Sequence, residues 1–351
     1  MRMLCVMMAA VIALCAARGP AQAAPAADPY RVVKTVKVGG EGGFDFVTAD
    51  AEGRKLYIPR GSGANGRVMV YDLDTLTTAG VIATTGAPRG VAVAPKSGHG
   101  FCTSKPVVMW DTQTLQPIKT INVQGNPDCI LLEPLTERIY VLSHSAPNAT
   151  VIDAKDGSVA GTIDLGGAPE QGVSDGQGHV YIALEDKNSV AVVDANTLKV
   201  TAHYSLEGKG GAPAGLALDA KHRILFACCA EPAAAVIMNA DDGKIITSLP
   251  IGAGVDSAVF NPATGEAFSS QRDGTLTVIK EKSPIRFEVE QTVQTRLGAK
   301  TLTLDAKTNR LVLITADRVK LPAQPAAPGQ GGRDRRAPLV PGSFTILVVG
   351  K

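Results

Sequence analysis

The sequence lacks an excess of charge of either sign. Its 351 residues include 35 Lys and Arg against 33 Asp and Glu. Arg2 and Arg18 lie in an N-terminal segment that we expect to be removed, and without them the two counts are equal. Binding to nucleic acid without sequence preference needs a basic surface that neutralises phosphates. The charge balance therefore disfavours nucleic acid as a partner.

The sequence also lacks long hydrophobic runs beyond its N-terminus. None approaches the roughly 18 consecutive apolar residues that a membrane-spanning helix needs. Met3–Ala17 is an uninterrupted apolar run that follows Arg2, and Ala21–Ala23 reads Ala-Gln-Ala, the small-residue pattern of a cleavage site. We therefore expect residues 1–23 to be a signal peptide cut after its last alanine, and the protein to be periplasmic or secreted with no membrane span.

The sequence also lacks amphipathic helices and several common binding and catalytic motifs. No amphipathic run of helical period is long enough to compete with strands. The glycine-rich phrases, such as "GGAP", begin strands rather than helices, so they do not form a nucleotide-binding loop. No Cys-x-x-Cys spacing supports a zinc site, and no nucleophile elbow supports a serine hydrolase.

The sequence has instead a repeat of about 40 residues, a period typical of stacked or circular arrays. The phrase "VYDLDT" returns as "MWDTQT", "VIDAKDG" and "VVDANT", and more weakly as "IMNADDG" and "VIKEKS". The equivalent positions, 39 to 45 residues apart, are Asp72, Asp111, Asp153, Asp194, Asn239 and Lys280. Similar openings, such as "GAPRGVAVAP" and "GAPAGLALDA", precede these phrases.

Each repeat has the pattern of four short strands. These are the opening run, a run such as "KLYIP" or "RIYVL", a run that ends at the repeated Asp, and a return such as "VAGTIDL". Gly, Asn-Thr and Asp-Gly pairs separate the runs, as in tight hairpins. Four-stranded repeats of this length are typical of β-propeller blades. Seven openings therefore predict an all-β, seven-bladed propeller that forms a single domain over residues 24–351.

The last repeat lacks its outer strand. It opens near Lys300 and ends with "SFTILVV" at Ser343–Val349. The run Val32–Val38 precedes the first opening, so we expect this N-terminal strand to complete the last blade and to close the ring. An open β-solenoid is the alternative, and this otherwise unplaced strand disfavours it. Residues 321–342, rich in Pro, Gly and Ala, are predicted to be a flexible insertion in the last blade.

The openings, the Asp-x-x-Thr turns and the ending "PGSFTILVVGK" resemble the exported YncE-like, YVTN-repeat β-propeller proteins. The resemblance covers nearly the whole chain after the signal peptide and implies the same fold. It gives little guidance on function, because most members of the family are uncharacterised. Some members are linked to nucleic-acid or cell-surface binding, and structural relatives include lactonases and quinoprotein-type propellers. It implies acids at the positions of Asp45, Asp128, Glu170 and Asp256, whereas the position of Arg89 is often histidine in the family. A metal held through that position would lack its ligand here.

Two sets of equivalent positions are predicted to surround the central channel. The first set begins the innermost strands and comprises Asp45, Arg89, Asp128, Glu170, Ala214, Asp256 and Lys300. The second follows the "LYI" runs and comprises Arg60, Lys105, His144, Glu185, Cys229, Arg272 and Asp317. Charges gathered in a concave mouth perturb each other's pKa values and bind ions or polar ligands. The alternative is a solvated rim whose charges pair across blades.

The favoured function is a monomeric exported binding or scaffold protein whose charged channel face binds a small polar ligand, a metal ion or a protein partner. The predicted ligand-binding residues are the charged members of the first set, Asp45, Arg89, Asp128, Glu170, Asp256 and Lys300. A metal-dependent periplasmic hydrolase or lactonase is the first alternative, with Asp128, His144, Glu170 and Glu185 as metal ligands. A nucleic-acid-binding propeller that uses Arg333, Arg335 and Arg336 is the second.

Four cysteines remain after the signal peptide: Cys102, Cys129, Cys228 and Cys229. Export permits disulfides, and four cysteines allow three complete pairings. We expect four thiols. If a bridge forms, Cys102–Cys129 is favoured because it would link neighbouring blades. A bridge between the adjacent Cys228 and Cys229, as in some quinoprotein propellers, is the other alternative.

Overall fold

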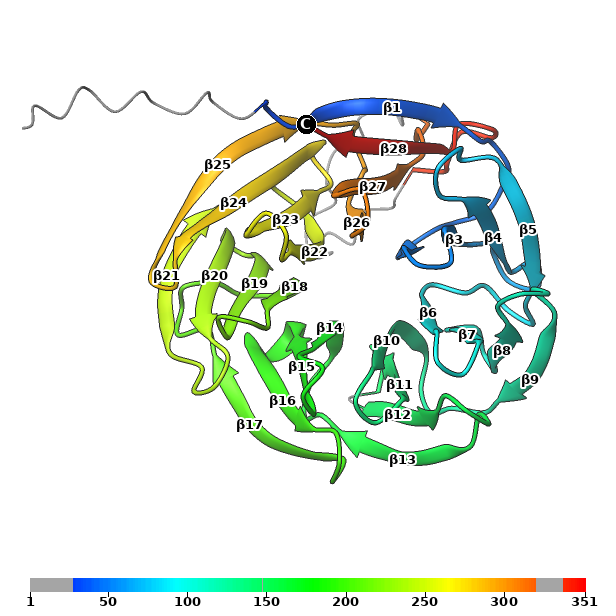
Figure 1. Ribbon diagram of the computed structural model, residues 1–351, viewed down its shortest axis with the longest axis horizontal. Coiled ribbons are helices and arrows are strands. Elements are labelled where there is room, and N and C mark those ends of the chain that lie inside the picture. The colour runs from blue at the N-terminus through cyan, green and yellow to red at the C-terminus, as the bar shows by residue number, and fades with distance from the viewer. Residues whose placement is uncertain (1–27, 147, 320–336) are drawn as a thin grey trace, which may run out of the picture.

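Seven antiparallel sheets, each of four strands, are arranged in a ring around a central axis (Figure 1). The computed structural model describes residues 28–146, 148–319 and 337–351. Within these residues the single helical element is the 3-10 turn η1 (Glu185–Lys187), and none of their helices is long and apolar enough to cross a membrane. The predicted all-β, seven-bladed propeller is confirmed; the predicted signal peptide, residues 1–23, lies outside the described residues.

Each blade runs from an innermost strand at the channel to an outermost strand at the periphery. Blade 1 comprises β2 (Thr48–Asp50), β3 (Lys55–Arg60), β4 (Arg67–Asp72) and β5 (Thr78–Ala83). Blade 2 comprises β6 (Val91–Ala94), β7 (His99–Cys102), β8 (Val107–Asp111) and β9 (Pro117–Ile121). Blade 3 comprises β10 (Pro127–Glu133), β11 (Arg138–Ser143), β12 (Asn148–Asp153) and β13 (Val159–Asp164). Blade 4 comprises β14 (Pro169–Ser174), β15 (His179–Leu184), β16 (Ser189–Asp194) and β17 (Lys199–Ser205).

The remaining three blades follow the same order. Blade 5 comprises β18 (Pro213–Asp219), β19 (Ile224–Ala230), β20 (Ala233–Asn239) and β21 (Ile245–Pro250). Blade 6 comprises β22 (Val255–Asn261), β23 (Glu266–Gln271), β24 (Thr275–Ser283) and β25 (Arg286–Gln294). Blade 7 comprises β26 (Thr301–Asp305), β27 (Arg310–Thr315), β28 (Thr345–Gly350) and β1 (Arg31–Lys37).

The core lies between the blades rather than within one layer. Seven apolar clusters are formed by the described residues, one at each junction of neighbouring sheets. Middle strands such as β15 and β16 are buried on both faces, so they read as nearly continuous apolar runs. The outermost strand β17 alternates exposed and half-buried residues, because only its inner face is covered. This difference explains the contrast between "VYIAL" and "KVTAHYS" in the sequence.

The repeated Asp-x-x-Thr phrase closes the hairpin between the third and fourth strands. Asp72 Oδ1 accepts hydrogen bonds from the backbone nitrogen and the hydroxyl of Thr75, at 2.8 and 2.9 Å. The next residue, Leu76, has a φ of 63°, in the left-handed region. The Asp-Gly version of the turn places Gly157 there with a φ of 68°, at no steric cost. The repeat in the sequence is therefore a repeat of one local turn.

Strand β1 closes the ring, as predicted. It pairs antiparallel with β28, with Val36 opposite Ile346, and becomes the outermost strand of the last blade (Figure 1). The first strand of the described chain is thus held against the last, which removes two unpaired sheet edges. Of the predicted flexible insertion, residues 320–336 lie outside the described residues. The remainder, 337–342, is folded, because Val340 N donates a hydrogen bond to Asp317 O at 2.8 Å.

All four cysteines are buried free thiols, as expected. The Cys102–Cys129 bridge is not formed. Cys228 and Cys229 are successive residues of β19, so their side chains point to opposite faces of the sheet. Cys228 packs in the core between blades 5 and 6 and Cys229 in the core between blades 4 and 5. Burial raises the pKa of the Cys102 thiol to about 11, consistent with a structural role.

Candidate functional site in the channel mouth

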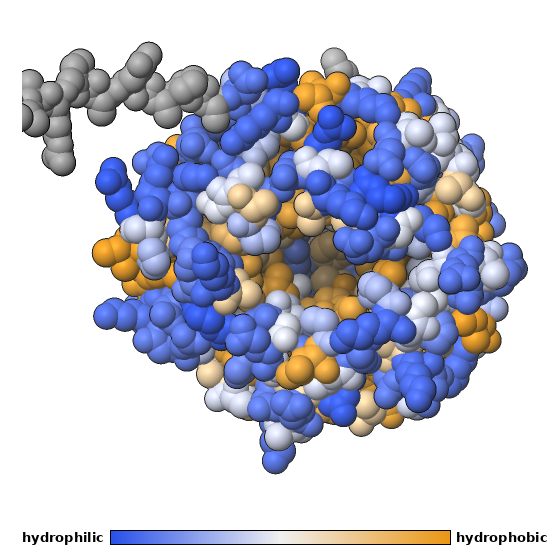
Figure 2. Space-filling view, viewed as in Figure 1, coloured by the Kyte–Doolittle hydropathy of each residue, from blue (hydrophilic) through white to orange (hydrophobic). Residues whose placement is uncertain are grey.

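One end of the central channel opens into a cavity of about 380 Å³. Figure 2 views the molecule along the ring axis and shows it hollowed at its centre. The cavity is lined by Asp45, Phe46, Arg89, Asp128, His144, Glu170, Glu185, Ala214, Ala230, Gly254, Val255, Asp256, Arg272 and Lys300. The structure thus brings together all six residues predicted to bind a ligand and all four predicted to bind a metal. We call this cavity the channel mouth.

The first predicted set converges because of its position in the blades. Its members lie at or just before the start of an innermost strand, and the innermost strands run side by side around the axis. Asp128 and Glu170, for example, are the second residues of β10 and β14. Equivalent residues of a closed ring necessarily meet at one end of its channel.

The second predicted set divides. His144, Glu185 and Arg272 line the channel mouth, but the other members lie elsewhere. Cys229 packs in the core, and the next residue, Ala230, lines the mouth instead. The positions that do not line the mouth are Arg60, Lys105, Cys229 and Asp317.

The three outlying charges have their own partners, and Lys105 Nζ donates a hydrogen bond to Gly125 O. Arg60 is 2% exposed, and its guanidinium lies 3.7 Å from the centre of the Phe344 ring. Burial lowers the pKa of Arg60 to about 10. Asp317 pairs with Arg296 at 2.5 Å. The loops after the second strands differ in length and direction, so equivalence in sequence does not keep these side chains in one ring.

On the side of blades 6, 7 and 1, the mouth contains a self-paired cluster. Lys300 Nζ lies 2.8 Å from Asp45 Oδ1 and also pairs with Asp256. Arg272 Nη2 lies 3.7 Å from the second carboxylate oxygen of Asp256. Lys300 is 9% exposed; burial alone would lower its pKa, but the two carboxylates outweigh burial and raise it. We call these four residues the Lys300 cluster, and its two cations and two carboxylates balance.

On the side of blades 3 and 4, two carboxylates flank a histidine. His144 Nδ1 lies 3.0 Å from Glu170 Oε1, and Nε2 lies 3.7 Å from Glu185 Oε2. The Glu170 carboxylate raises the pKa of His144 to about 9, so the imidazole is protonated at neutral pH. One nitrogen and two carboxylate oxygens come within 4.8 Å of one another, a separation that a single metal ion can bridge. We call these residues the His144 cluster.

Asp128 also lines the mouth, but it does not belong to the group whose ligand atoms lie within 4.8 Å of one another. Its Oδ2 lies 3.2 Å from Arg89 Nη1, whereas its Oδ1 is buried and accepts no hydrogen bond from the described residues. Burial raises the pKa values of Asp128 and Glu170. A buried carboxylate oxygen without a donor is costly, so this side of the mouth favours an added cation or hydrogen-bond donor.

Sequence analysis missed a polar side chain that crosses the channel. Gln171 Oε1 accepts hydrogen bonds from Leu216 N at 3.0 Å and from Ala258 N at 2.9 Å. Its Nε2 donates to Ala258 O at 2.9 Å. Gln171 therefore links the innermost strand of blade 4 to those of blades 5 and 6, directly beside Glu170. The glutamine breaks the otherwise apolar or small pattern of the opening phrases, which was the only signal available.

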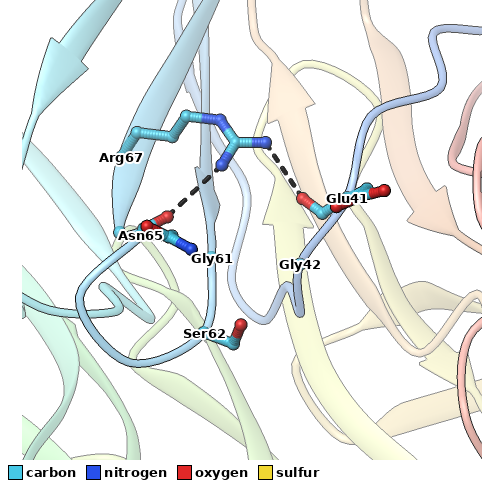
Figure 3. A pocket seen from close by; sticks show the side chains of 7 residues that line it. Glu41, Gly42, Gly61, Ser62, Asn65 and Arg67 are labelled. Carbon is cyan, nitrogen blue, oxygen red and sulfur yellow. Dashed lines mark hydrogen bonds between the residues drawn. The ribbon is translucent and has the colours of Figure 1, made fainter.

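A larger depression of about 560 Å³ lies at the rim of blade 1 (Figure 3). Arg67 is its cation, and the guanidinium donates to Glu41 O at 2.9 Å and Asn65 O at 3.3 Å. Gly42 and Gly61 approach so closely that a Cβ on Gly42 would lie 2.6 Å from Gly61 Cα. Its arginine is engaged by backbone carbonyls, so this depression offers less chemistry than the channel mouth.

Comparison with known proteins supports the fold. No family model matches the chain, and no curated protein matches it. Solved structures do match, among them a crystal structure of RRP9 WD40 repeats, with a TM-score of 0.68 at 12% identity, and a structure of U3-55K, with a TM-score of 0.69 at 12% identity. The first match covers 92% of this chain and 97% of the other, and the second covers 91% and 98%. At this identity the likeness shows the seven-bladed propeller alone.

Proposed function

We propose that the protein is an exported binding scaffold whose channel mouth binds a small polar ligand that carries a positive charge. The observation that carries the proposal is the buried, unpartnered Oδ1 of Asp128 next to the His144 cluster. The cavity, about 380 Å³, is of a size that suits small ligands. The resemblance to exported YVTN-repeat propellers and the N-terminal apolar segment support the periplasmic or secreted location.

The charges of the mouth support a cationic ligand. Five carboxylates line it, from Asp45, Asp128, Glu170, Glu185 and Asp256. Arg89, Arg272 and Lys300 are permanent cations, and His144 adds a fourth positive charge while protonated. One negative charge therefore remains. Because the Lys300 cluster balances within itself, this charge belongs to the side that contains Asp128, Glu170 and Glu185.

Titration with a simple diamine and with divalent cations tests the proposal. We expect 1,4-diaminobutane to raise the Tm of the protein, more at pH 7.5 than at pH 5, because Asp128 and Glu170 must lose their protons to bind a cation. The double variant Asp128→Asn, Glu170→Gln should lose this response and keep its β-sheet circular dichroism. The control replaces the exposed carboxylates of Asp74 and Glu52 in the same way and should keep the response.

A metal-dependent hydrolase is a second candidate, favoured by the 4.8 Å grouping of His144, Glu170 and Glu185. Such a site would bind a divalent ion through one imidazole and two carboxylates and would activate a water molecule for attack on a lactone or ester. Metal binding to His144 must displace the proton that Glu170 stabilises, so affinity should rise until about pH 9. Diamine binding needs no loss of that proton. The two pH profiles therefore separate the candidates. The absence of both stoichiometric metal and lactone turnover with added calcium, zinc or manganese would remove the hydrolase.

Nothing in the described residues favours the nucleic-acid alternative. The three arginines on which it depends, Arg333, Arg335 and Arg336, lie outside them. The mouth itself has a carboxylate surplus, which repels phosphates.

A further inference from the structure

A second cluster of ligand-type side chains lies at the opposite end of the channel strands. Ala214, near the start of β18, lines the mouth, and Asp219 ends the same strand at the other rim. His222 follows in the turn to β19, and Glu281 reaches toward it from β24 of blade 6. His222 Nδ1 lies 2.7 Å from Asp219 Oδ2 and 2.9 Å from Glu281 Oε1. One nitrogen and two oxygens thus converge at the junction of blades 5 and 6.

The carboxylate of Glu281 is buried without adequate partners. Its side chain is 4% exposed, and neither oxygen accepts a hydrogen bond of ordinary geometry from the described residues. Asp219 is equally buried; its Oδ1 accepts from Lys221 N at 2.9 Å and His222 N at 3.2 Å, so Oδ2 is left to face the cluster. The cluster therefore lacks positive charge.

Two other junctions supply that charge with arginine. Arg223 of blade 5 reaches Asp175 of blade 4 at 2.8 Å. Arg54 of blade 1 reaches Asp305 of blade 7 at 2.8 Å. Each arginine comes four residues after the Asp that ends the innermost strand of its own blade, Asp219 for Arg223 and Asp50 for Arg54.

At the junction of blades 5 and 6 the arginine is missing. The equivalent residue of blade 6, four after Asn261, is Gly265, and Glu281 N donates to its carbonyl at 3.0 Å. The extended strand β24 places Glu281 where the arginine would reach. A second carboxylate thus occupies the place that a cation fills at the other two junctions.

We propose that Asp219, His222 and Glu281 bind a divalent first-row transition metal ion at this junction. Ligands about 2.0–2.2 Å from a metal and at right angles to one another lie about 3 Å apart, close to the separations observed here. An imidazole with two carboxylates suits ions such as Zn²⁺ or Mn²⁺ better than Ca²⁺, which prefers oxygen ligands alone. The His222 side chain is 38% exposed, so water can reach the ion and complete its coordination.

The ion would act as a clamp between two blades. It binds residues of blade 5 and blade 6 together in the folded protein, and the unfolded chain does not hold them in this geometry. Binding therefore stabilises the ring by mass action. This role is independent of the channel mouth, because the two sites lie at opposite ends of β18 and share no residue.

Metal titration of the protein over residues 24–351 tests the proposal. A His144→Gln, Glu170→Gln background removes two of the three residues of the His144 cluster, including its only imidazole. In EDTA-treated protein of this background, we expect Zn²⁺ or Mn²⁺ to bind with one equivalent by calorimetry and to raise the Tm, whereas Ca²⁺ at the same concentration does neither. Addition of Glu281→Gln should weaken the binding at least about tenfold, the smallest loss seen even for outer-shell partners.

The matched control is His179→Gln, in blade 4. His179 Nδ1 also lies beside a buried carboxylate, Asp175 at 3.0 Å, but the third group there is Arg223. This variant should keep the parent affinity. Metal-free Glu281→Gln should melt no lower than its parent, because the change removes one of two adjacent carboxylates, so weaker binding cannot be assigned to unfolding.

Two results would overturn the proposal. One is the absence of saturable Zn²⁺ and Mn²⁺ binding in the background protein, and the other is equal affinity with and without Glu281→Gln. If the glutamine variant does not fold, His222→Gln provides the same comparison at a half-exposed position, and equal affinity there overturns the proposal too.

Discussion

On one side of the channel mouth, in blades 6, 7 and 1, Lys300 lies between Asp45 and Asp256, and every carboxylate has a cation beside it. On the other side, in blades 2 to 4, Asp128 has a carboxylate oxygen without a donor and His144 takes up a proton between Glu170 and Glu185. Both sides use the same positions of the repeat. The difference shows that one ring of charged residues can contain a self-paired ion cluster on one side and a buried carboxylate oxygen without a donor on the other, where we propose that a ligand binds.

The largest expected effect comes from Lys300→Met. The change leaves Asp45 and Asp256 facing each other at the mouth without their ammonium, and loss of one partner of a buried pair costs about 3–5 kcal/mol. Urea unfolding of parent and variant measures the difference. The control is Lys307→Met, in the same blade as Lys300. It breaks only an exposed pair with Glu52 and should cost at most about 1 kcal/mol. If Lys300→Met lowers the free energy of unfolding as little as the control does, the Lys300 cluster stabilises the fold no more than an exposed ion pair.

The triple variant Lys300→Met, Asp45→Asn, Asp256→Asn sharpens the same comparison. Replacement of a whole buried charge cluster by neutral groups is often far less costly than removal of one member. We therefore expect the two amide substitutions to recover much of the stability lost in Lys300→Met. No recovery in urea unfolding would mean that the lysine stabilises the ring by packing rather than by charge.

Gln171→Ala should have an intermediate effect, because this residue joins the two sides of the mouth. The change leaves the backbone nitrogens of Leu216 and Ala258 without their acceptor, at a cost of about 1–3 kcal/mol. Thermal and urea unfolding report the loss, with Gln113→Ala in the exposed β8–β9 turn as the control. If Gln171 positions Glu170, diamine binding should weaken as well. Unchanged stability and unchanged binding would show that the hydrogen bonds of Gln171 contribute to neither.

The smallest effect is the pH dependence of His144. Its pKa is about 9 in the folded protein, above the unfolded value of about 6.5, so its stabilising contribution is complete below pH 6.5 and disappears as the pH rises through 9. The Tm difference between parent and His144→Gln should therefore shrink from pH 6.5 to pH 9.5. In a Glu170→Gln background the difference should lose most of this dependence, since Glu170 is the main cause of the raised pKa. A difference constant with pH would contradict the ion pair.

Much of the candidate site could be located from the sequence, but not its division into two sides. The first set of positions lies at the start of the innermost strands, and ring closure brings these positions together regardless of the side chains present. The second set lies at the ends of the second strands or in the loops that follow them. Arg60 and Asp317 therefore have partners elsewhere, whereas Arg272 lines the mouth. Gln171 and the Asp219, His222 and Glu281 group escaped sequence analysis because their contacts join residues of different blades.

The sequence by itself determined the blades. Each Asp-x-x-Thr or Asp-Gly phrase forms its turn through hydrogen bonds within a few residues, as Asp72 and Thr75 do, and the apolar runs determine which strands are buried on both faces. The unplaced strand before the first repeat determined the closure of the ring. Only the tertiary structure decided which charges meet. Whether Lys300 lies between two carboxylates, or Glu281 turns toward His222, depends on strand twist and side-chain conformation across blades up to 255 residues apart in the chain, which no local pattern encodes.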